Sequence, residues 1–166
     1  MSKQIIICDL DGTLCNCEHR VHHVRQSPKN WDAFYAGVKD DTVNEAVLRV
    51  LENFLDSDHW DYELIFSSGR PERCRADTEL WLWEHGFENR CDRSFGPSLR
   101  SEDGYPYTLI MRKDGDYRPD YVVKQRMLDK YIDKERVLFA MDDRNQVVDM
   151  WRRNGITCFQ VQDGNF

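Results

Sequence analysis

The chain has 166 residues, a net charge of −7, 40% hydrophobic residues and 32% charged residues, a composition typical of one ordinary globular domain. No stretch approaches the roughly 18 apolar residues that span a bilayer, and the N-terminal residues lack a secretory signal pattern. We therefore expect a cytoplasmic protein without a membrane partner, whose six cysteines remain reduced thiols.

The predicted elements begin with an apolar strand over residues 3–9. A polar and aromatic segment over residues 15–41 follows, and after it an amphipathic helix over residues 42–56. Thr42 and Glu45 have the spacing of a capping box, so this helix is expected to start at Thr42.

A second strand is predicted over residues 62–67, and a second helix over residues 71–85. Pro71 suits the first turn of this helix, and Gly86 suits the position after its last residue. The next segment, residues 87–119, is rich in turn signals.

The C-terminal part alternates again, with helices over 120–132 and 144–154 and strands over 136–141 and 156–161. The predicted strands are short and apolar without strict alternation, which is typical of parallel strands buried on both faces. Strands that alternate with helices predict an α/β fold, here a doubly wound, open and mostly parallel sheet in a single domain over residues 1–166.

Two segments, 15–41 and 87–119, interrupt this alternation, and a further strand is predicted at 107–112 within the second. We expect both to form loops or small caps beside the carboxyl ends of strands, where open α/β sheets bind ligands. Residues 70–126 contain nine arginines but no excess of basic over acidic residues. A local anion pocket therefore fits better than a long nucleic-acid track, which needs a basic face.

Residues able to carry chemistry follow the predicted strands or open the next helices: Asp9, Asp11, Ser68, Arg70, Lys124, Asp142, Asp143 and Arg144. We expect them to converge, because the carboxyl ends of parallel strands meet at one edge of a sheet. Carboxylates that share one place repel each other unless a cation lies among them, and Mg²⁺ prefers oxygen ligands. A hydroxyl, a lysine and helix N-terminal amides suit a phosphoryl group. The pattern predicts a magnesium-dependent phosphoryl-transfer site.

The pentapeptide 9–13 by itself also fits a capped turn or a calcium loop. The calcium pattern fails, because position 12 of a loop that begins at Asp9 is Arg20 rather than glutamate. The combination with the serine, the lysine and the paired aspartates favours a catalytic site over the turn.

These motifs resemble those of the haloacid dehalogenase-like phosphatases: "DLDGT" at 9–13, Ser68, Lys124 and "DD" at 142–143. Three stretches are similar to the phosphatase half of phage-type polynucleotide kinase-phosphatases: "FSSGR", "MRKDGDYRPDYVVK" and the terminal "AMDDRNQVVDMWRRNGITCFQVQDGNF". The kinase half of such proteins carries the loop G-x-x-x-x-G-K-[ST], which this sequence lacks. We therefore expect no kinase domain and no phosphorylation of 5′ ends.

By this resemblance, Asp9 is the nucleophile that accepts the phosphoryl group. Asp11 protonates the leaving oxygen and later activates water, and the neighbouring carboxylates are expected to raise its pKa. Mg²⁺ is expected to be held by Asp9, the main-chain carbonyl of Asp11, and one or both of Asp142 and Asp143. The residues expected to bind phosphate, contact substrate or brace the site are Ser68, Lys124, Arg70, Arg112 and Arg144.

The resemblance implies a phosphatase of DNA or RNA 3′ ends, acting on a terminal phosphate and also on a 2′,3′-cyclic one. A phosphatase of free nucleotides or of another small metabolite would use the same chemistry and stays an alternative. A module that binds phosphorylated ends without turning them over is a third interpretation, against which the full set of catalytic motifs argues.

Two further patterns in the 15–41 segment have more than one interpretation. Zinc binding is one for the cluster Cys15, Cys17, His19, His22 and His23, although its spacing fits no standard finger. The aromatic residues Trp31, Phe34 and Tyr35 could stack on a base or simply pack the cap.

Overall fold

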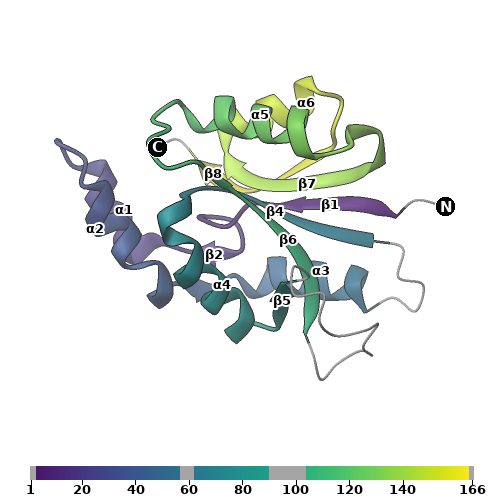
Figure 1. Cartoon of the computed structure of the whole chain (residues 1–166), viewed down its shortest axis with the longest axis horizontal. Coiled ribbons are helices and arrows are strands. Elements are labelled where there is room, and N and C mark those ends of the chain that lie inside the picture. Colours follow the sequence, from purple (N-terminus) through teal and green to yellow (C-terminus); the bar gives the residue numbers. More distant parts are fainter. Residues whose placement is uncertain (1–2, 57–61, 90–103, 165–166) are drawn as a thin grey trace.

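The computed structural model describes residues 3–56, 62–89 and 104–164. Its centre is a six-stranded parallel sheet in the order β5-β6-β4-β1-β7-β8 (Figure 1). The strands are β1 (Gln4–Cys8), β4 (Tyr62–Pro71), β5 (Phe87–Asn89), β6 (Tyr105–Arg112), β7 (Val137–Arg144) and β8 (Cys158–Gly164). The five predicted strands are thus confirmed, and the short edge strand β5 is an addition to them.

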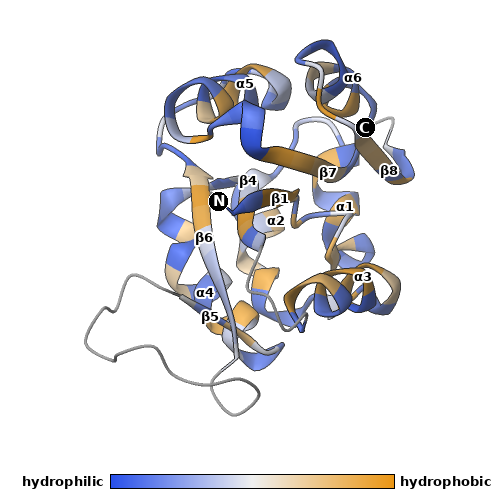
Figure 2. Cartoon of the chain, turned by 90° about the vertical axis from the view of Figure 1, so that its right-hand side faces the viewer, coloured by the Kyte–Doolittle hydropathy of each residue, from blue (hydrophilic) through white to orange (hydrophobic). Residues whose placement is uncertain are grey.

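Helices cover both faces of this sheet (Figure 1): α3 (Glu45–Leu55) and α4 (Arg75–Glu84) lie on one side, and α5 (Asp120–Tyr131) and α6 (Asn145–Arg153) on the other. Strand side chains alternate between the two faces. Ile6 and Cys8 of β1 pack in the core beneath α3 and α4, whereas Ile5 and Ile7 pack in the core beneath α5 and α6. Figure 2 shows the hydrophobic residues of β1 and β7 in the middle of the molecule. The expected doubly wound α/β fold is confirmed.

The segment after β1 forms a small helical cap. It contains α1 (Glu18–Arg25), α2 (Trp31–Ala36) and a 3-10 turn, η1 (Val38–Asp40), between two short strands, β2 (Cys15–Asn16) and β3 (Thr42–Val43). These strands pair antiparallel and so hold the entry and the exit of the cap together. A minor core of buried side chains fills it: Cys17, Val21, Val24 and Phe34.

Two predicted helix starts are wrong. Thr42 pairs with Asn16 in the β2–β3 ladder, so α3 is capped instead by Asn44, whose side chain accepts a hydrogen bond from the Ala46 N–H at 3.2 Å. Pro71 is the last residue of β4, and α4 begins only after a 3-10 turn, η2 (Glu72–Cys74).

The segment 87–119 does not lie as a whole beside the strand ends. Phe87 pairs with Tyr105 at the start of β6, so β5 lies away from the carboxyl edge of the sheet. Residues 113–119 follow the carboxyl end of β6, whereas residues 90–103 lie outside the described residues. Within the described ranges, none of the helices combines the length and hydropathy of a bilayer-spanning segment.

Candidate active site

Three carboxylates meet where β1 and β7 end. Asp9 directly follows β1, and Asp142 and Asp143 are near the end of β7, which pairs with β1 in parallel. One carboxylate oxygen from each lies within 4.8 Å of the other two, and all three residues are buried. Lys124 of α5 donates hydrogen bonds to Asp9 Oδ1 at 2.6 Å and to Asp142 Oδ2 at 2.8 Å. Two strands and one helix thus build one charged cluster, as the sequence predicts.

Burial and mutual repulsion disfavour negative charge in this cluster. Burial raises the pKa of the Asp9 carboxyl well above its ordinary value, Lys124 opposes this rise, and Asp142 and Asp143 add to it. Burial, together with the Asp142 charge, raises the pKa of Asp143 to about 6. Lys124 alone therefore neutralises these carboxylates incompletely.

The same cluster fits a hard divalent cation. Asp143 Oδ2 is buried and has no hydrogen-bond partner, although nearly all buried polar atoms have one. Gly12 faces this atom with a φ of +86°, and a Cβ at Gly12 would overlap the Asp143 carboxylate. An unsatisfied carboxylate oxygen in a donor set made of oxygen atoms is the kind of ligand that Mg²⁺ prefers.

The Asp11 carboxylate belongs to a different cluster. Its Oδ1 accepts hydrogen bonds from Arg70 Nε at 3.0 Å, from Arg70 Nη2 at 2.5 Å and from Arg20 Nη2 at 2.5 Å. Burial by itself would raise the pKa of Asp11, but Arg70 and Arg20 outweigh it and hold that pKa below its ordinary range. The predicted raised pKa is therefore wrong, because two guanidinium groups rather than further carboxylates surround this side chain.

Arg20 and Asp41 complete a buried network that sequence reasoning missed. Arg20 of α1 donates to Asp41 from Nε at 2.6 Å and from Nη2 at 2.5 Å, and Arg70 Nη2 donates to Asp41 at 2.9 Å. Arg20 and Arg70 are 1% and 0% exposed. The network joins the cap to β4 and orients Asp11, but no local spacing pattern links an arginine of one helix with an aspartate 21 residues later.

Ser68 and Arg112, two further predicted site residues, make hydrogen bonds near the Asp9 cluster. Ser68 is buried near the end of β4, and its Oγ accepts the Arg70 backbone N–H at 3.2 Å. Arg112 donates to the Gly69 carbonyl at 2.8 Å and to the Asp120 carboxylate at 3.0 Å. These contacts hold the end of β4 against the start of α5.

Asp120, which sequence reasoning also missed, links three cations. Its carboxylate lies 3.0 Å from Arg112, 3.7 Å from Lys124 and 3.9 Å from Arg144. Burial opposes ionisation, but Lys124, Arg144 and Arg112 together lower the pKa of Asp120. A sequence signal existed, since Asp120 precedes Lys124 by one helical turn and the i, i+4 positions face each other.

The chain matches the family model of the polynucleotide kinase PNKP phosphatase domain over residues 3–166. The chain belongs to this family. It is therefore a phosphatase domain of the haloacid dehalogenase type, and thus a phosphoric monoester hydrolase.

Similar proteins agree with this family. A protein of Autographa californica nuclear polyhedrosis virus, assigned as a bifunctional polynucleotide kinase/RNA ligase, is 30% identical over 150 residues, which are 89% of this chain and 17% of the viral protein. Two structures of the Pnkp1/Rnl/Hen1 complex, one described as an RNA repair complex, contain chains 32% and 33% identical, with TM-scores of 0.71 and 0.70. The matches cover 99% and 100% of this chain but 44% and 48% of those chains, so it spans less than half the length of these relatives.

A more distant structure shows the fold alone. It is a haloacid dehalogenase-like hydrolase from Streptococcus pneumoniae that is 13% identical, with a TM-score of 0.59, and the match covers 95% of this chain and 84% of that one.

The PNKP-type phosphatase domain shows no zinc cluster at residues 15–23. Among the described residues, three or more metal-ligating side chains approach one another only as Asp9/Asp142/Asp143 and as Asp11/Cys15/Asp41. In the second group, Arg20 and Arg70 already bind both carboxylates. The five cysteines within the described ranges are buried free thiols, so zinc binding by the cysteine and histidine cluster is not supported.

Proposed function

We propose that this domain is a Mg²⁺-dependent phosphatase that removes the terminal 3′ phosphate of nucleic-acid ends through a phosphorylated Asp9, and that also acts on 2′,3′-cyclic phosphates. The observation that carries this proposal is the buried cluster of Asp9, Asp142, Asp143 and Lys124, within a chain that matches the PNKP phosphatase family over nearly its whole length. The names of the relatives add the link to polynucleotides and RNA repair.

Asp9 is proposed as the nucleophile because it is fixed at the end of a buried strand by Lys124. A carboxylate oxygen of Asp9 forms a bond to phosphorus, and the bond between phosphorus and the 3′ oxygen breaks. Water then attacks the phosphorylated Asp9, which releases inorganic phosphate and restores the carboxylate.

Asp11 is proposed to move the protons of both steps. It gives a proton to the departing 3′ oxygen and takes one from the attacking water. Arg20 and Arg70 favour its carboxylate form, which is the form that the water-activating step needs. To donate a proton to the leaving oxygen, Asp11 must first be protonated, and the two arginines disfavour its protonated form. Proton donation is therefore the more demanding of the two roles.

Lys124 and Ser68 are proposed to hold the phosphoryl group, since both are buried at the carboxyl edge of the sheet around Asp9. Arg144, at the start of α6, adds positive charge on the same side. Arg70 and Arg112 are proposed as positioning residues, because Asp11, Asp120 and main-chain carbonyls already bind their guanidinium groups.

Mg²⁺ is proposed to bind Asp9, the main-chain carbonyl of Asp11, and one or both of Asp142 and Asp143. The unsatisfied oxygen of Asp143 supports this assignment. When bound, the ion supplies positive charge that lets these carboxylates ionise together and that balances the phosphoryl oxygens.

Phosphate release from a 3′-phosphorylated oligonucleotide, compared with release from 3′- and 5′-mononucleotides, tests the proposed substrate. We expect efficient release from the oligonucleotide with Mg²⁺, none with EDTA, and none from the Asp9→Asn variant. The exposed Asp149 provides a control, Asp149→Asn, that removes the same charge outside the site and should behave as wild type. Turnover of mononucleotides only would instead support a nucleotide phosphatase.

A further inference from the structure

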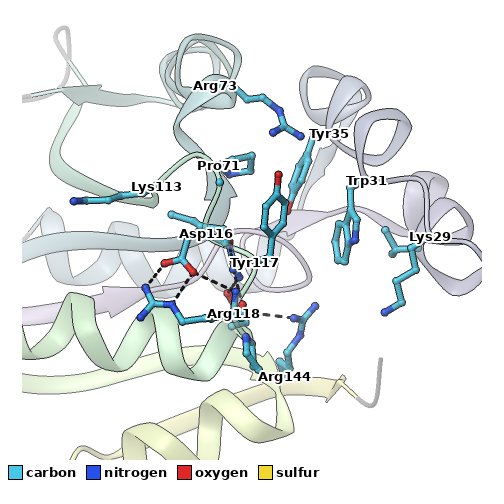
Figure 3. A pocket seen from close by; sticks show the side chains of 15 residues that line it. Lys29, Trp31, Tyr35, Pro71, Arg73, Lys113, Asp116, Tyr117, Arg118 and Arg144 are labelled. Atoms are coloured by element: carbon cyan, nitrogen blue, oxygen red, sulfur yellow. Dashed lines mark hydrogen bonds and ion pairs between the residues drawn. The ribbon is translucent and has the colours of Figure 1, made fainter.

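A cavity of about 340 Å³ opens between the cap and the loop that follows β6 (Figure 3). Arg112, Asp120 and Arg144 line it on the side of the catalytic cluster. Asp120 lies 3.7 Å from Lys124, which in turn binds Asp9, so the cavity adjoins the place where the phosphoryl group is proposed to bind. Its volume is at the lower end of the roughly 300–1,000 Å³ of small-molecule sites, so it suits one compact group such as a nucleoside.

Three aromatic rings line this cavity: Trp31 and Tyr35 of α2, and Tyr117 of the loop (Figure 3). The rings of Trp31 and Tyr35 stack at 5.9 Å with an interplanar angle of 22°. Trp31 is 40% exposed and Tyr117 is 92% exposed, which places two of the seven exposed large hydrophobic side chains of the described residues at one cavity. Solvent-exposed rings clustered in this way indicate a binding surface.

Packing of the cap accounts for Phe34 and in part for Tyr35, which packs against the small core of the cap, but it leaves Trp31 40% exposed. Phe34, next to Tyr35, is 6% exposed, belongs to the small core of the cap, and lies under the Arg20 guanidinium at 4.2 Å. Phe34 therefore fills the packing role, whereas Trp31 lies outside that core and faces the cavity.

The cavity is basic although the chain is acidic. Six cationic side chains line it against two acidic ones, in a chain of net charge −7. The Lys29 ammonium lies 5.6 Å from the centre of the Trp31 ring, and the Arg73 guanidinium lies 5.7 Å from the centre of the Tyr35 ring. Cations beside exposed aromatic rings suit a nucleic-acid strand, because its phosphates attract cations and its bases stack on aromatic side chains.

We propose that this cavity binds the terminal nucleoside of a single-stranded 3′ end. The base stacks on Trp31 and Tyr117, and the cationic side chains that line the cavity hold the phosphate that precedes it in the strand. This inference rests on the proposed function and adds to it that the end is read as an unpaired base. The terminal base of a duplex has only one free face, whereas stacking on two rings needs both. Stacking has little sequence preference, so all four bases are accepted.

The test compares two single-stranded oligonucleotides with a 3′-terminal phosphate, one ending in a normal nucleoside and one ending in an abasic residue. Wild type should show a KM for the abasic substrate that is higher by roughly 5- to 150-fold, the range that a base stack worth 1–3 kcal/mol gives at 1.4 kcal/mol per tenfold. Trp31→Ala and Tyr117→Ala should raise KM for the normal substrate only, so that the preference for the base shrinks while kcat for both substrates is kept.

Two control variants remove an exposed ring elsewhere: Trp83→Ala on α4 and Tyr131→Ala on α5, residues that are 68% and 53% exposed. Both should keep the wild-type preference for the base. Equal KM for the two substrates in wild type, or an unchanged preference in both Trp31→Ala and Tyr117→Ala, would overturn the inference and leave the proposed function standing. Absence of phosphate release from either oligonucleotide, together with turnover of mononucleotides, would overturn the proposed function and this inference with it.

Discussion

The Asp143→Asn variant tests whether the buried cluster of Asp9, Asp142, Asp143 and Lys124 raises the pKa of Asp143. Without metal, the pKa of Asp143 is about 6 in the folded protein and about 3.9 in an unfolded chain. The folded state therefore binds more protons between these two values, and its free energy of unfolding falls as the pH rises through this range. Two pKa units correspond to about 3 kcal/mol, and the whole of this penalty is present at about pH 8.

Urea unfolding in EDTA measures this penalty. At about pH 8, Asp143→Asn should be more stable than wild type by up to about 3 kcal/mol, and at about pH 4 the difference should nearly vanish. Saturating Mg²⁺ should stabilise wild type at the higher pH, by about 2.7 kcal/mol at a hundredfold excess over Kd, and should stabilise the variant much less. Asp149→Asn serves as the matched charge control. The same pH dependence of stability in EDTA and the same response to Mg²⁺ in wild type and Asp143→Asn would contradict both the raised pKa of Asp143 and its proposed part in Mg²⁺ binding.

Three further variants test other parts of the site. Lys124→Met should lower kcat by about 10²–10³-fold, since it removes the charge that is proposed to hold the phosphoryl group. Steady-state phosphate release measures this, and a wild-type rate would contradict the proposed role of the lysine. Arg20→Met should cost about 3–5 kcal/mol in urea unfolding, because it removes one of the two guanidinium groups that neutralise the Asp11 and Asp41 carboxylates. The exposed Arg25→Met should cost less than about 1 kcal/mol, and equal effects of the two variants would contradict the buried network. Gly12→Ala should weaken Mg²⁺ binding in calorimetry, because its methyl group would overlap the Asp143 carboxylate at a positive φ, and an unchanged Kd would argue against metal binding there.

The fold could be predicted from local patterns because a buried parallel sheet has strong ones. The strands near residues 3–9 and 136–141 are continuous apolar runs, and in the structure both are central strands with helices on each face. Helix starts were less predictable. Thr42 has good capping chemistry, but pairing with Asn16, which is distant in the sequence, places it in a strand.

The catalytic cluster was predictable for the same topological reason. Strand ends of one parallel sheet meet at one edge, so Asp9, Asp142 and Asp143 had to lie near one another. The partners of Asp11 were not predictable, because Arg20 reaches it from a cap whose position depends on the packing of the whole 15–41 segment. The predicted direction of the Asp11 pKa shift was wrong for this reason. The direction depends on which charges come within about 3 Å of the carboxylate, and the sequence contains no pattern that fixes this.

Rapid acid quenching followed by peptide mass spectrometry tests directly whether Asp9 receives the phosphoryl group from a nucleic-acid 3′ end. With a 3′-phosphorylated oligonucleotide and Mg²⁺, we expect a transient phosphate on the peptide that contains Asp9, and none with the 5′-phosphorylated isomer of the same sequence. Phosphate on a different residue, or continued turnover of the 3′-phosphorylated substrate by Asp9→Asn, would contradict this role of Asp9.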